Sequence, residues 1–247
     1  MQRLMCIIEY DGSGFAGYQV QPNKRTVQGV IERALGKIHK GDPIRSYASG
    51  RTDASVHACG QVVHFDSYLK IPPNRWTKAI NTLLPDDVYV ISSHIVNDSF
   101  HSRFNVTSKE YRYKIDTSSK RNVFRRRYAY YFPYSLDYVA MKEAIKYLVG
   151  TNDFTSFCSA KTNKEDKVRT IYEIEFEREA DELTFRFVGD GFLYNMVRII
   201  IGTLLEVGQG KIESNEVKEI LDGKNRSLAG KLVPGHGLYL WKVNYDN

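Results

Sequence analysis

The segment YASGRTDASVHACGQVVHFD, from Tyr47 to Asp66, carries an arginine and an aspartate two residues apart between two strand-like runs. Alternate side chains of an extended backbone point to one face, so Arg51 and Asp53 can project together from a loop set on rigid strands. Such a loop is a plausible place for a poised carboxylate. The same spacing is typical of a solvated surface pair, so the spacing alone leaves both interpretations open.

A basic segment in the second half of the chain is the next candidate. It is followed by Tyr128, Tyr130 and Tyr131, and this mixture of charge and flat rings is typical of an RNA-binding surface. A solvated loop has the same composition. The basic residues are Lys120, Arg121, Arg125, Arg126 and Arg127, and the lysines at 161, 164 and 167 are further candidates for phosphate contacts.

Arg198 borders an unbroken apolar stripe that runs from Leu193 to Leu205 at helical spacing. A charged side chain in that position is largely desolvated and needs a carboxylate partner. Arg198 is therefore either a member of a structural ion pair or part of a site.

Two other patterns are poor matches to the sites that they resemble. Gly12, Gly14 and Gly17 have the GxGxxG spacing of a dinucleotide-binding turn, but the segment that follows contains Pro22 and no helical period. The spacing of His57 and His64 fits no helical metal pair, and no cysteine joins them at ligand spacing. We expect hydrogen-bonded histidines and no metal.

Length and composition are those of a folded globular protein. The 247 residues suffice for one large domain or two of ordinary size, and 42% of them are hydrophobic. The formal net charge of +6 permits a polyanionic partner without requiring one. Three widely spaced cysteines predict reduced thiols, and the apolar run before Glu9 is too short for a secretion signal or a membrane span. We expect a cytoplasmic protein.

The order of the expected elements predicts an α+β fold with two ferredoxin-like (βαββαβ-type) halves, residues 1–104 and 105–247. Each half would have an antiparallel sheet with helices on one face. Thr26 is the expected N-cap of the first helix, and Ser135 that of the helix that ends before Gly150. The first half is expected to contain strands at 4–10, 44–49, 61–66 and 88–96 and helices at 27–38 and 72–84. The second half is expected to contain strands at 109–115, 128–132, 170–177, 183–188 and 239–243 and helices at 135–148, 193–205 and 214–221.

The motif from Gly50 to Ala58, GRTDASVHA, with Gln61 and His64 after it, closely resembles the active-site motif of the tRNA pseudouridine synthase A (TruA) family. Further motifs resemble that family in the same order, so the resemblance covers essentially the whole chain. They are YDG from Tyr10, GYQ from Gly17, FHSR from Phe100, KEYRY from Lys109, DFTSF from Asp153, GFLYNMVR from Gly191 and PGHGL from Pro234.

Two residues depart from the family pattern: Ser55 stands where the family usually has glycine, and Tyr18 where it usually has tryptophan. If that glycine has a positive φ, Ser55 costs about 1 kcal/mol and can reshape the loop. Both departures bear on the range of targets more than on the chemistry.

The resemblance implies an isomerase that converts uridine to pseudouridine at positions 38, 39 and 40 of the tRNA anticodon stem and loop, without a metal or an organic cofactor. It also implies a homodimer and an active-site cleft between the two halves. By the resemblance, Asp53 is the catalytic residue and Tyr111 stacks on the flipped uracil and assists proton removal at C5. Arg198 would pair with Asp53, and Arg51 would help to hold the base flipped out.

Two other classes of function remain as alternatives. A non-catalytic RNA-binding module would use the same type of sheet and the same basic segment, so Asp53, Tyr111 and Arg198 are the discriminating set. A glycosidase or nucleoside hydrolase would need a second carboxylate and would release free base.

Overall fold

The computed structural model describes residues 1–162 and 165–246, which form a mixed α+β protein as predicted. The chain divides into two compact units: unit 1 is Met1–Thr107 with Tyr239–Asn247, and unit 2 is Ser108–Leu238. The expected division placed the C-terminal strand in the second half. Strand β10 (Leu238–Tyr245) instead groups almost entirely with unit 1, because it pairs in parallel with β3 (His57–Ser67).

The sheet of unit 1 is centred on β1 (Gln2–Tyr10), which lies antiparallel between β3 and β4 (Val88–Val96). Strand β2 (Tyr47–Ala48) is shorter than expected and pairs with β3, which begins at His57 rather than at residue 61. Strand β3 is buried along nearly its whole length, so its sequence lacks the alternation that marks a half-buried strand. The alternating pattern therefore predicts only the later part of this strand.

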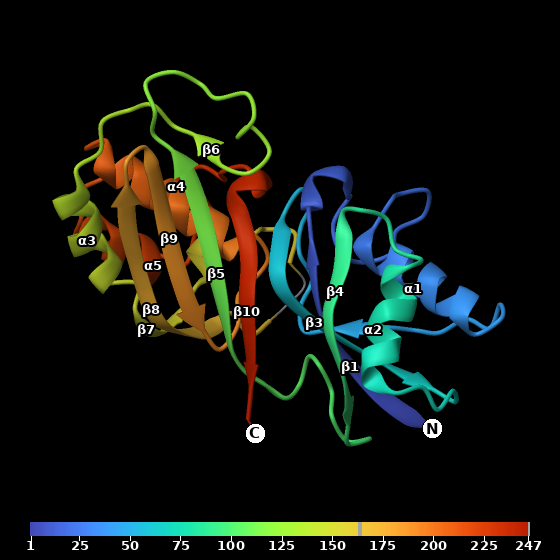
Figure 1. The fold of residues 1–247 in the computed structure, drawn as a ribbon. Coiled ribbons are helices and arrows are strands. Elements are labelled where there is room, and N and C mark those ends of the chain that lie inside the picture. Colours follow the sequence, from blue (N-terminus) through green and yellow to red (C-terminus); the bar gives the residue numbers. More distant parts are fainter. Residues whose placement is uncertain (163–164, 247) are drawn as a thin grey trace. The chain divides into compact units, whose positions relative to one another are not determined.

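Helices α1 (Val27–Ile38) and α2 (Pro73–Asn81) lie on the same side of β1 and β4 (Figure 1). The prediction for α1 is confirmed, including its cap: the Thr26 hydroxyl accepts a hydrogen bond of 3.3 Å from the Gly29 N–H. Helix α2 ends earlier than expected. The Asn81 side chain bonds both the N–H and the carbonyl of Val90 on β4, at 2.7 and 2.9 Å, and so fixes the end of α2 to the sheet.

The sheet of unit 2 runs in the order β5 (Val106–Asp116), β9 (Glu182–Gly189), β8 (Val168–Glu179), β7 (Gly150–Asp153). Strand β7 was not expected, since Gly150 was assigned only the end of a helix. Strand β6 (Tyr130–Tyr131) pairs with β5 in parallel, as β10 does with β3, so neither unit is purely antiparallel.

Unit 2 contains α3 (Tyr138–Lys146), α4 (Met196–Gly208) and α5 (Glu216–Asp222). The N-cap of α3 is Asp137 and not Ser135, because the Asp137 carboxylate accepts hydrogen bonds from the N–H groups of residues 139 and 140. Helix α4 is buried along nearly its whole length and lies behind β8 and β9 in Figure 1. Short 3₁₀ turns occupy Gly12–Gly14, Thr155–Phe157, Arg226–Leu228 and Gly235–Gly237. Across the described part of the chain, no helix is both long and apolar enough to cross a membrane.

Candidate active site

Asp53 lies on the loop between β2 and β3, and its neighbour Thr52 fastens that loop to β1. The Thr52 side chain is buried, and its hydroxyl oxygen lies 2.8 Å from the hydroxyl oxygen of Tyr10. The Thr52 carbonyl accepts a hydrogen bond of 3.0 Å from the Tyr18 N–H. Burial raises the pKa of Tyr10 to about 12, which keeps this phenol neutral at neutral pH. Asp53 is half-buried beside this anchor, whereas Arg51 is exposed.

Gln61 provides a second anchor for the same loop. Its side chain is fully buried, and its Oε1 accepts a hydrogen bond of 2.6 Å from the Ser49 hydroxyl. Its Nε2 donates to the Gly50 carbonyl at 2.9 Å. Gln61 belongs to the motif that resembles the family, but its residue type and position predicted no role for it. Its role is to hold the backbone on the N-terminal side of Asp53.

Two residues with positive φ shape the turn around Asp53. Gly17 has φ +105°, and a β-carbon there would lie 2.9 Å from the Thr52 carbonyl oxygen. Ser55 has φ +65°, so the position that departs from the family pattern does adopt the backbone that favours glycine. The Val56 N–H donates to the Asp53 carbonyl at 3.2 Å and closes the turn.

The glycine-rich segment after β1 is not a dinucleotide-binding turn. Gly12 and Gly14 bound a single 3₁₀ turn, and the next helix, α1, begins only at Val27. The Gly12 N–H donates to Nδ1 of His57 at 3.1 Å, so this segment supports the start of β3. The ring of His57 also stacks on Tyr239 of β10, with centroids 4.7 Å apart.

The two histidines of β3 are hydrogen-bonded, as expected, and Asp66 also has a protein partner. His57 Nδ1 accepts from a backbone N–H, and His64 Nδ1 accepts from the Ser102 N–H at 3.2 Å. Asp66 forms a two-pronged ion pair with Arg3, and this pairing lowers the pKa of Asp66. Within residues 1–162 and 165–246, no group of three or more histidines, cysteines, aspartates or glutamates is placed to hold a metal ion.

Tyr111 lies on β5 of unit 2, opposite Phe187 of β9. Its ring is 8% exposed and meets the Phe192 ring edge to face, with centroids 5.1 Å apart. The same strand carries Tyr113, whose hydroxyl donates to the Pro234 carbonyl at 2.8 Å. Tyr111 is therefore part of a packed aromatic layer that fixes its ring.

Arg198 lies in the first turn of α4 and is half-buried, whereas the apolar stripe predicted a largely desolvated side chain. Its Nε donates to the Val233 carbonyl at 2.8 Å, and its Nη1 donates to Oδ1 of Asn195 at 3.0 Å. Asn195 has φ +65° and begins the helix. A β-carbon at Gly202 would lie 1.7 Å from the Lys231 carbonyl oxygen, so the segment that holds Arg198 packs directly on the helix backbone.

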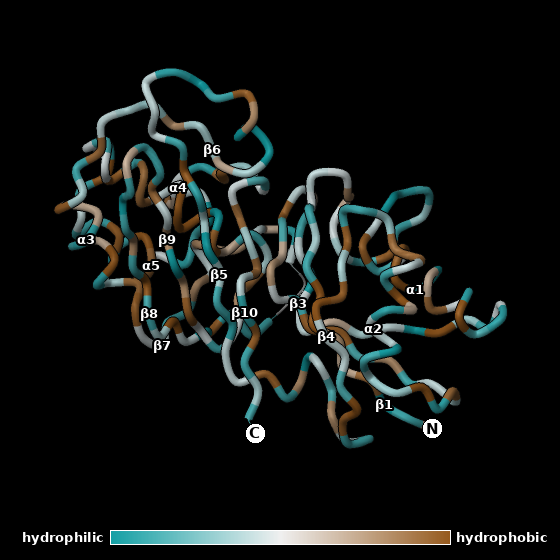
Figure 2. The backbone as a smooth tube through the Cα atoms, viewed as in Figure 1, coloured by the Kyte–Doolittle hydropathy of each residue, from teal (hydrophilic) through white to brown (hydrophobic). Residues whose placement is uncertain are grey.

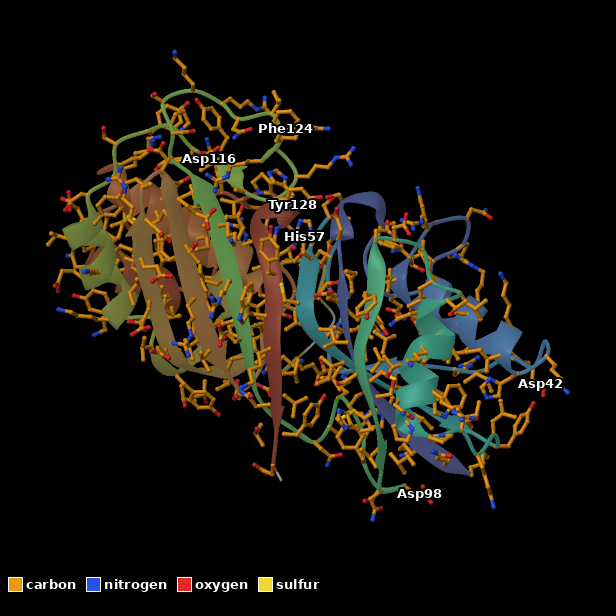
Figure 3. All side chains as sticks on the ribbon, viewed as in Figure 1. Asp42, His57, Asp98, Asp116, Phe124 and Tyr128 are labelled. Atoms are coloured by element: carbon orange, nitrogen blue, oxygen red, sulfur yellow. The ribbon has the colours of Figure 1, made fainter. Side chains whose placement is uncertain are left out.

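The basic segment between β5 and β6 folds as a series of turns and is mostly teal or pale in Figure 2 apart from a short brown stretch. Phe124 and Tyr128 lie on it (Figure 3). Its members differ: Arg125 forms an ion pair with Glu182 and lies 3.8 Å from Asp116, whereas Arg126 donates to a backbone carbonyl at 2.7 Å. A small pocket beside it is lined by Arg121, Asn122, Arg126, Tyr130, Tyr131 and His236, among others. Lys164, one of the three lysines considered above, lies outside the described residues.

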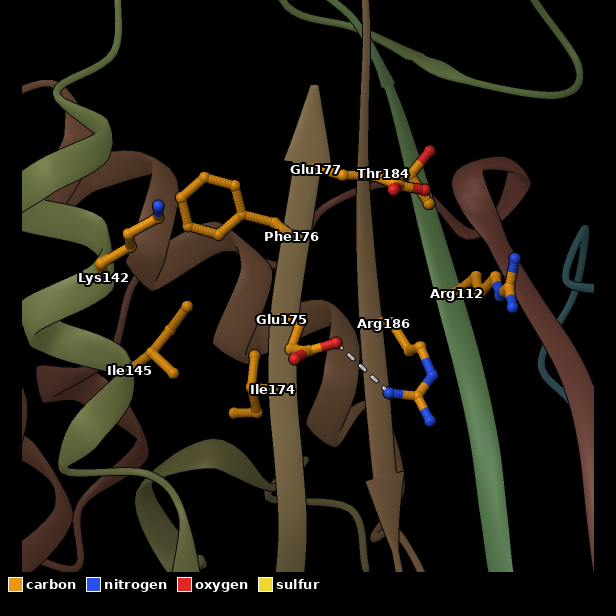
Figure 4. Close-up of a pocket in the computed structure, with 9 residues that line it drawn as sticks. All are labelled: Arg112, Lys142, Ile145, Ile174, Glu175, Phe176, Glu177, Thr184 and Arg186. Atoms are coloured by element: carbon orange, nitrogen blue, oxygen red, sulfur yellow. Dashed lines mark hydrogen bonds and ion pairs between the residues drawn. The ribbon is translucent and has the colours of Figure 1, made fainter. Parts of the chain in front are cut away.

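A larger surface pocket lies over β8 and β9 beside α3, and sequence analysis did not predict it (Figure 4). Its two arginines are paired with glutamates. Arg186 pairs with Glu173, Glu175 and Glu110, and Arg112 donates to Glu110 at 2.8 Å. These ion pairs offset the two arginine charges, while Lys142 and Glu177 add one charge of each sign to the lining.

The predicted residues are thus shared between the units: Arg51 and Asp53 belong to unit 1, and Tyr111, Arg198 and the basic segment belong to unit 2. Thr52 and Gly50 anchor the Asp53 loop within unit 1, and Phe192, Asn195 and Val233 contact Tyr111 or Arg198 within unit 2. The arrangement around Asp53, a half-buried carboxylate on a loop anchored from both sides, is suited to a nucleophile or a general base.

The chain matches the family described as tRNA pseudouridine synthase over residues 6–105 and 144–246. A protein of Anoxybacillus flavithermus named tRNA pseudouridine synthase A is 63% identical over 247 residues and is aligned over 100% of both chains. A protein of Bacillus subtilis (strain 168) with the same name is 57% identical over 246 residues, which are 99% of this chain and 100% of the relative. A chain from the crystal structure of a Cbf5-Nop10-Gar1 complex is 13% identical, and the alignment covers 81% of this chain and 54% of that chain. The TM-score of 0.35 is too low for an inference about fold or function.

Proposed function

The chain belongs to the tRNA pseudouridine synthase family, and on this premise we propose that it isomerises uridine to pseudouridine at positions 38, 39 and 40 of the tRNA anticodon stem and loop. The observation that carries the proposal within the molecule is the placement of Asp53. Its loop is fixed at Thr52 and at Gly50, so the carboxylate is positioned before substrate arrives.

The reaction is an isomerisation and needs no oxidant or second substrate. The bond between C1′ and N1 breaks, and a bond between C1′ and C5 forms. C5 then loses its proton and N1 gains one. The base must leave its stack to turn over in this way, so the uridine is flipped into the site. Asp53 starts the sequence, either by attack on the sugar or the base or by removal of a proton from C2′.

The other site residues have roles that follow from their chemistry and from the family resemblance. Tyr111 stacks on the uracil and assists proton removal at C5, and the packed layer around its ring supports this assignment. Arg198 pairs with Asp53 and keeps it ionised. Arg51, which is exposed on the same loop, helps to hold the base flipped out.

The strand order of unit 1 supports the finer description of the fold. Strand β1 is flanked by β4 and β3, β2 lies beyond β3, and both helices lie on one side, as in a ferredoxin-like unit. We also propose that the protein is a cytoplasmic homodimer. The dimer assignment comes from the family resemblance, and light scattering at micromolar concentration tests it.

The decisive experiment is Asp53→Asn, assayed with tRNA tritiated at C5 of uridine. Asparagine is nearly isosteric, so the fold and most of the tRNA affinity should persist. It cannot act as a carboxylate nucleophile or base, so tritium release should fall by several orders of magnitude. The matched control is Asp86→Asn, the same change at an exposed aspartate of unit 1, which should release tritium at the wild-type rate.

Measurable turnover by folded Asp53→Asn protein, with deamidation to aspartate excluded by mass spectrometry, would remove Asp53 from the chemistry. The wild-type protein separates the alternatives. Tritium release with the base retained supports the synthase, release of free uracil supports a hydrolase, and tRNA binding without either supports an RNA-binding module.

A further inference from the structure

Four aromatic side chains of unit 1 form a continuous cluster that reaches the surface. Tyr47 stacks on His64 with ring centroids 5.0 Å apart. His64 meets His101 at 4.6 Å, and His101 meets Phe104 at 4.3 Å. The outer members are open to solvent, since Phe104 is 74% exposed and Tyr47 is 48% exposed. We call these four residues the aromatic platform.

Ser102, which is fully buried, anchors the His64 ring and the backbone of Tyr47. The Ser102 N–H donates to Nδ1 of His64 at 3.2 Å, and its hydroxyl donates to the Tyr47 carbonyl at 2.7 Å. The Ser102 carbonyl accepts a hydrogen bond of 2.6 Å from the Tyr245 hydroxyl on β10. The inner ring and the backbone beneath Tyr47 are therefore fixed before RNA binds, which lowers the entropy cost of stacking on this cluster.

A cation without an acidic partner in the described part of the chain lies beside the platform. Arg103 is exposed, its guanidinium lies 5.7 Å from the centre of the Phe104 ring, and it makes no ion pair within the described residues. Arg3 is nearby, paired with Asp66. Burial lowers the pKa of His101, and the positive charges of Arg3 and Arg103 lower it further, which is the effect of a positive field at this ring.

We propose that the aromatic platform is a second tRNA contact, on which an unpaired base stacks against Phe104 or Tyr47 while Arg103 binds the adjoining phosphate. This inference rests on the proposed function. Flat rings beside a basic side chain bind unpaired nucleotides without reading their sequence. Exposed rings also occur in protein interfaces, but exposed rings beside Arg103 match an anionic strand better than a second copy of a chain that is itself basic.

The position of the platform separates it from the reacting uridine. The Asp53 loop joins β3 at His57, and the platform lies at His64 on the same strand. The seven residues from His57 to His64 span about 23 Å at roughly 3.3 Å per residue, and Tyr47 precedes Asp53 by six residues, which reach at most about 20 Å. The base on the platform is therefore a different nucleotide from the uridine at Asp53, and the contact affects how RNA is held rather than the chemical step.

The test compares Phe104→Ala with Phe104→Tyr in the full chain, by filter binding of tRNA and by steady-state pseudouridine formation. Loss of one stacked ring should weaken tRNA affinity and raise KM by roughly 5- to 100-fold, with kcat at saturation within about 2-fold. Phe104→Tyr keeps the ring and should behave as wild type. Tyr89→Ala removes a ring of unit 1 that is 51% exposed on β4 and serves as the matched control, with no change expected.

Unchanged tRNA affinity of the Phe104→Ala variant would overturn the proposal. A loss of tRNA affinity together with a lower mass of the protein by light scattering would also overturn it, because that result would assign Phe104 to a protein interface. If the Phe104→Ala variant fails to fold, the wild-type protein can be cross-linked to tRNA with ultraviolet light and digested with trypsin. RNA attached to the peptide 104–109 supports the proposal. Cross-links on other peptides but none on this one overturn it. The filter-binding measurements do not depend on pseudouridine formation. A wild-type protein that binds tRNA through Phe104 but forms no pseudouridine would refute the proposed function and leave the platform standing.

Discussion

Replacement of Ser55 by glycine should stabilise the protein. Ser55 has φ +65°, a backbone that costs an L-residue energy because its β-carbon approaches the following carbonyl. The conformation is imposed from outside: the Ser55 N–H donates to the Phe15 carbonyl at 3.4 Å, and the Val56 N–H closes the turn onto the Asp53 carbonyl at 3.2 Å. The loop cannot relax this residue without losing those contacts.

The size of the effect is the difference between two terms. A left-handed backbone costs an L-residue roughly 1–2 kcal/mol, and glycine loses about 0.5–1 kcal/mol more chain entropy on folding. The net gain for Ser55→Gly therefore lies between about 0 and 1.5 kcal/mol, with a central value of about 0.5–1 kcal/mol. At roughly 2–4 °C per kcal/mol for a chain of this size, Tm should rise by about 1–4 °C.

Scanning calorimetry of two controls separates the backbone term from other causes. Ser55→Ala removes the hydroxyl but keeps a β-carbon at the same φ, so its Tm should stay below that of Ser55→Gly. Ala54→Gly makes the adjacent change at a residue without positive φ and should lower Tm. A lower Tm for Ser55→Gly, or an equal rise for Ser55→Ala, would refute the assignment of strain to the left-handed backbone.

Two further predictions concern charge. Arg125→Gln should lower the stability of the protein more than Arg126→Gln does, because Arg125 is paired with Glu182. Arg126→Gln should weaken tRNA binding more, and it should reduce the slope of log affinity against log salt concentration by about one. Equal effects of both changes on Tm and on tRNA affinity would contradict this division. Burial and nearby positive charge lower the pKa of His64 to about 4, whereas a histidine in an unfolded chain has a pKa of about 6.5. Between these two pH values the unfolded state binds more protons than the folded state. The stability of the fold should therefore decrease as the pH drops from about 6.5 to 4. The variant His64→Gln should flatten that part of the curve of Tm against pH, and an unchanged curve would show that His64 does not carry it.

The sequence alone determined the features that depend on neighbours along the chain. Helix α1 was predicted with its bounds and its Thr26 cap because apolar spacing and capping act within a few residues. The bounds of β4 were also predicted, because the residues that form the strand are contiguous in the sequence. The Asp53 motif is also contiguous, so its resemblance to a family is contained in a single stretch of residues.

Only the tertiary structure decided the features that join distant residues. Strand β7 forms because residues 150–153 pair with β8, and β10 groups with unit 1 because it pairs with β3; no local pattern signals either pairing. The anchor of the Asp53 loop joins Tyr10 to Thr52, and the pairing of Arg125 depends on Glu182. A single side chain has the same local signal whether it meets solvent or a partner, so its role is fixed only when folding brings that partner within bonding distance.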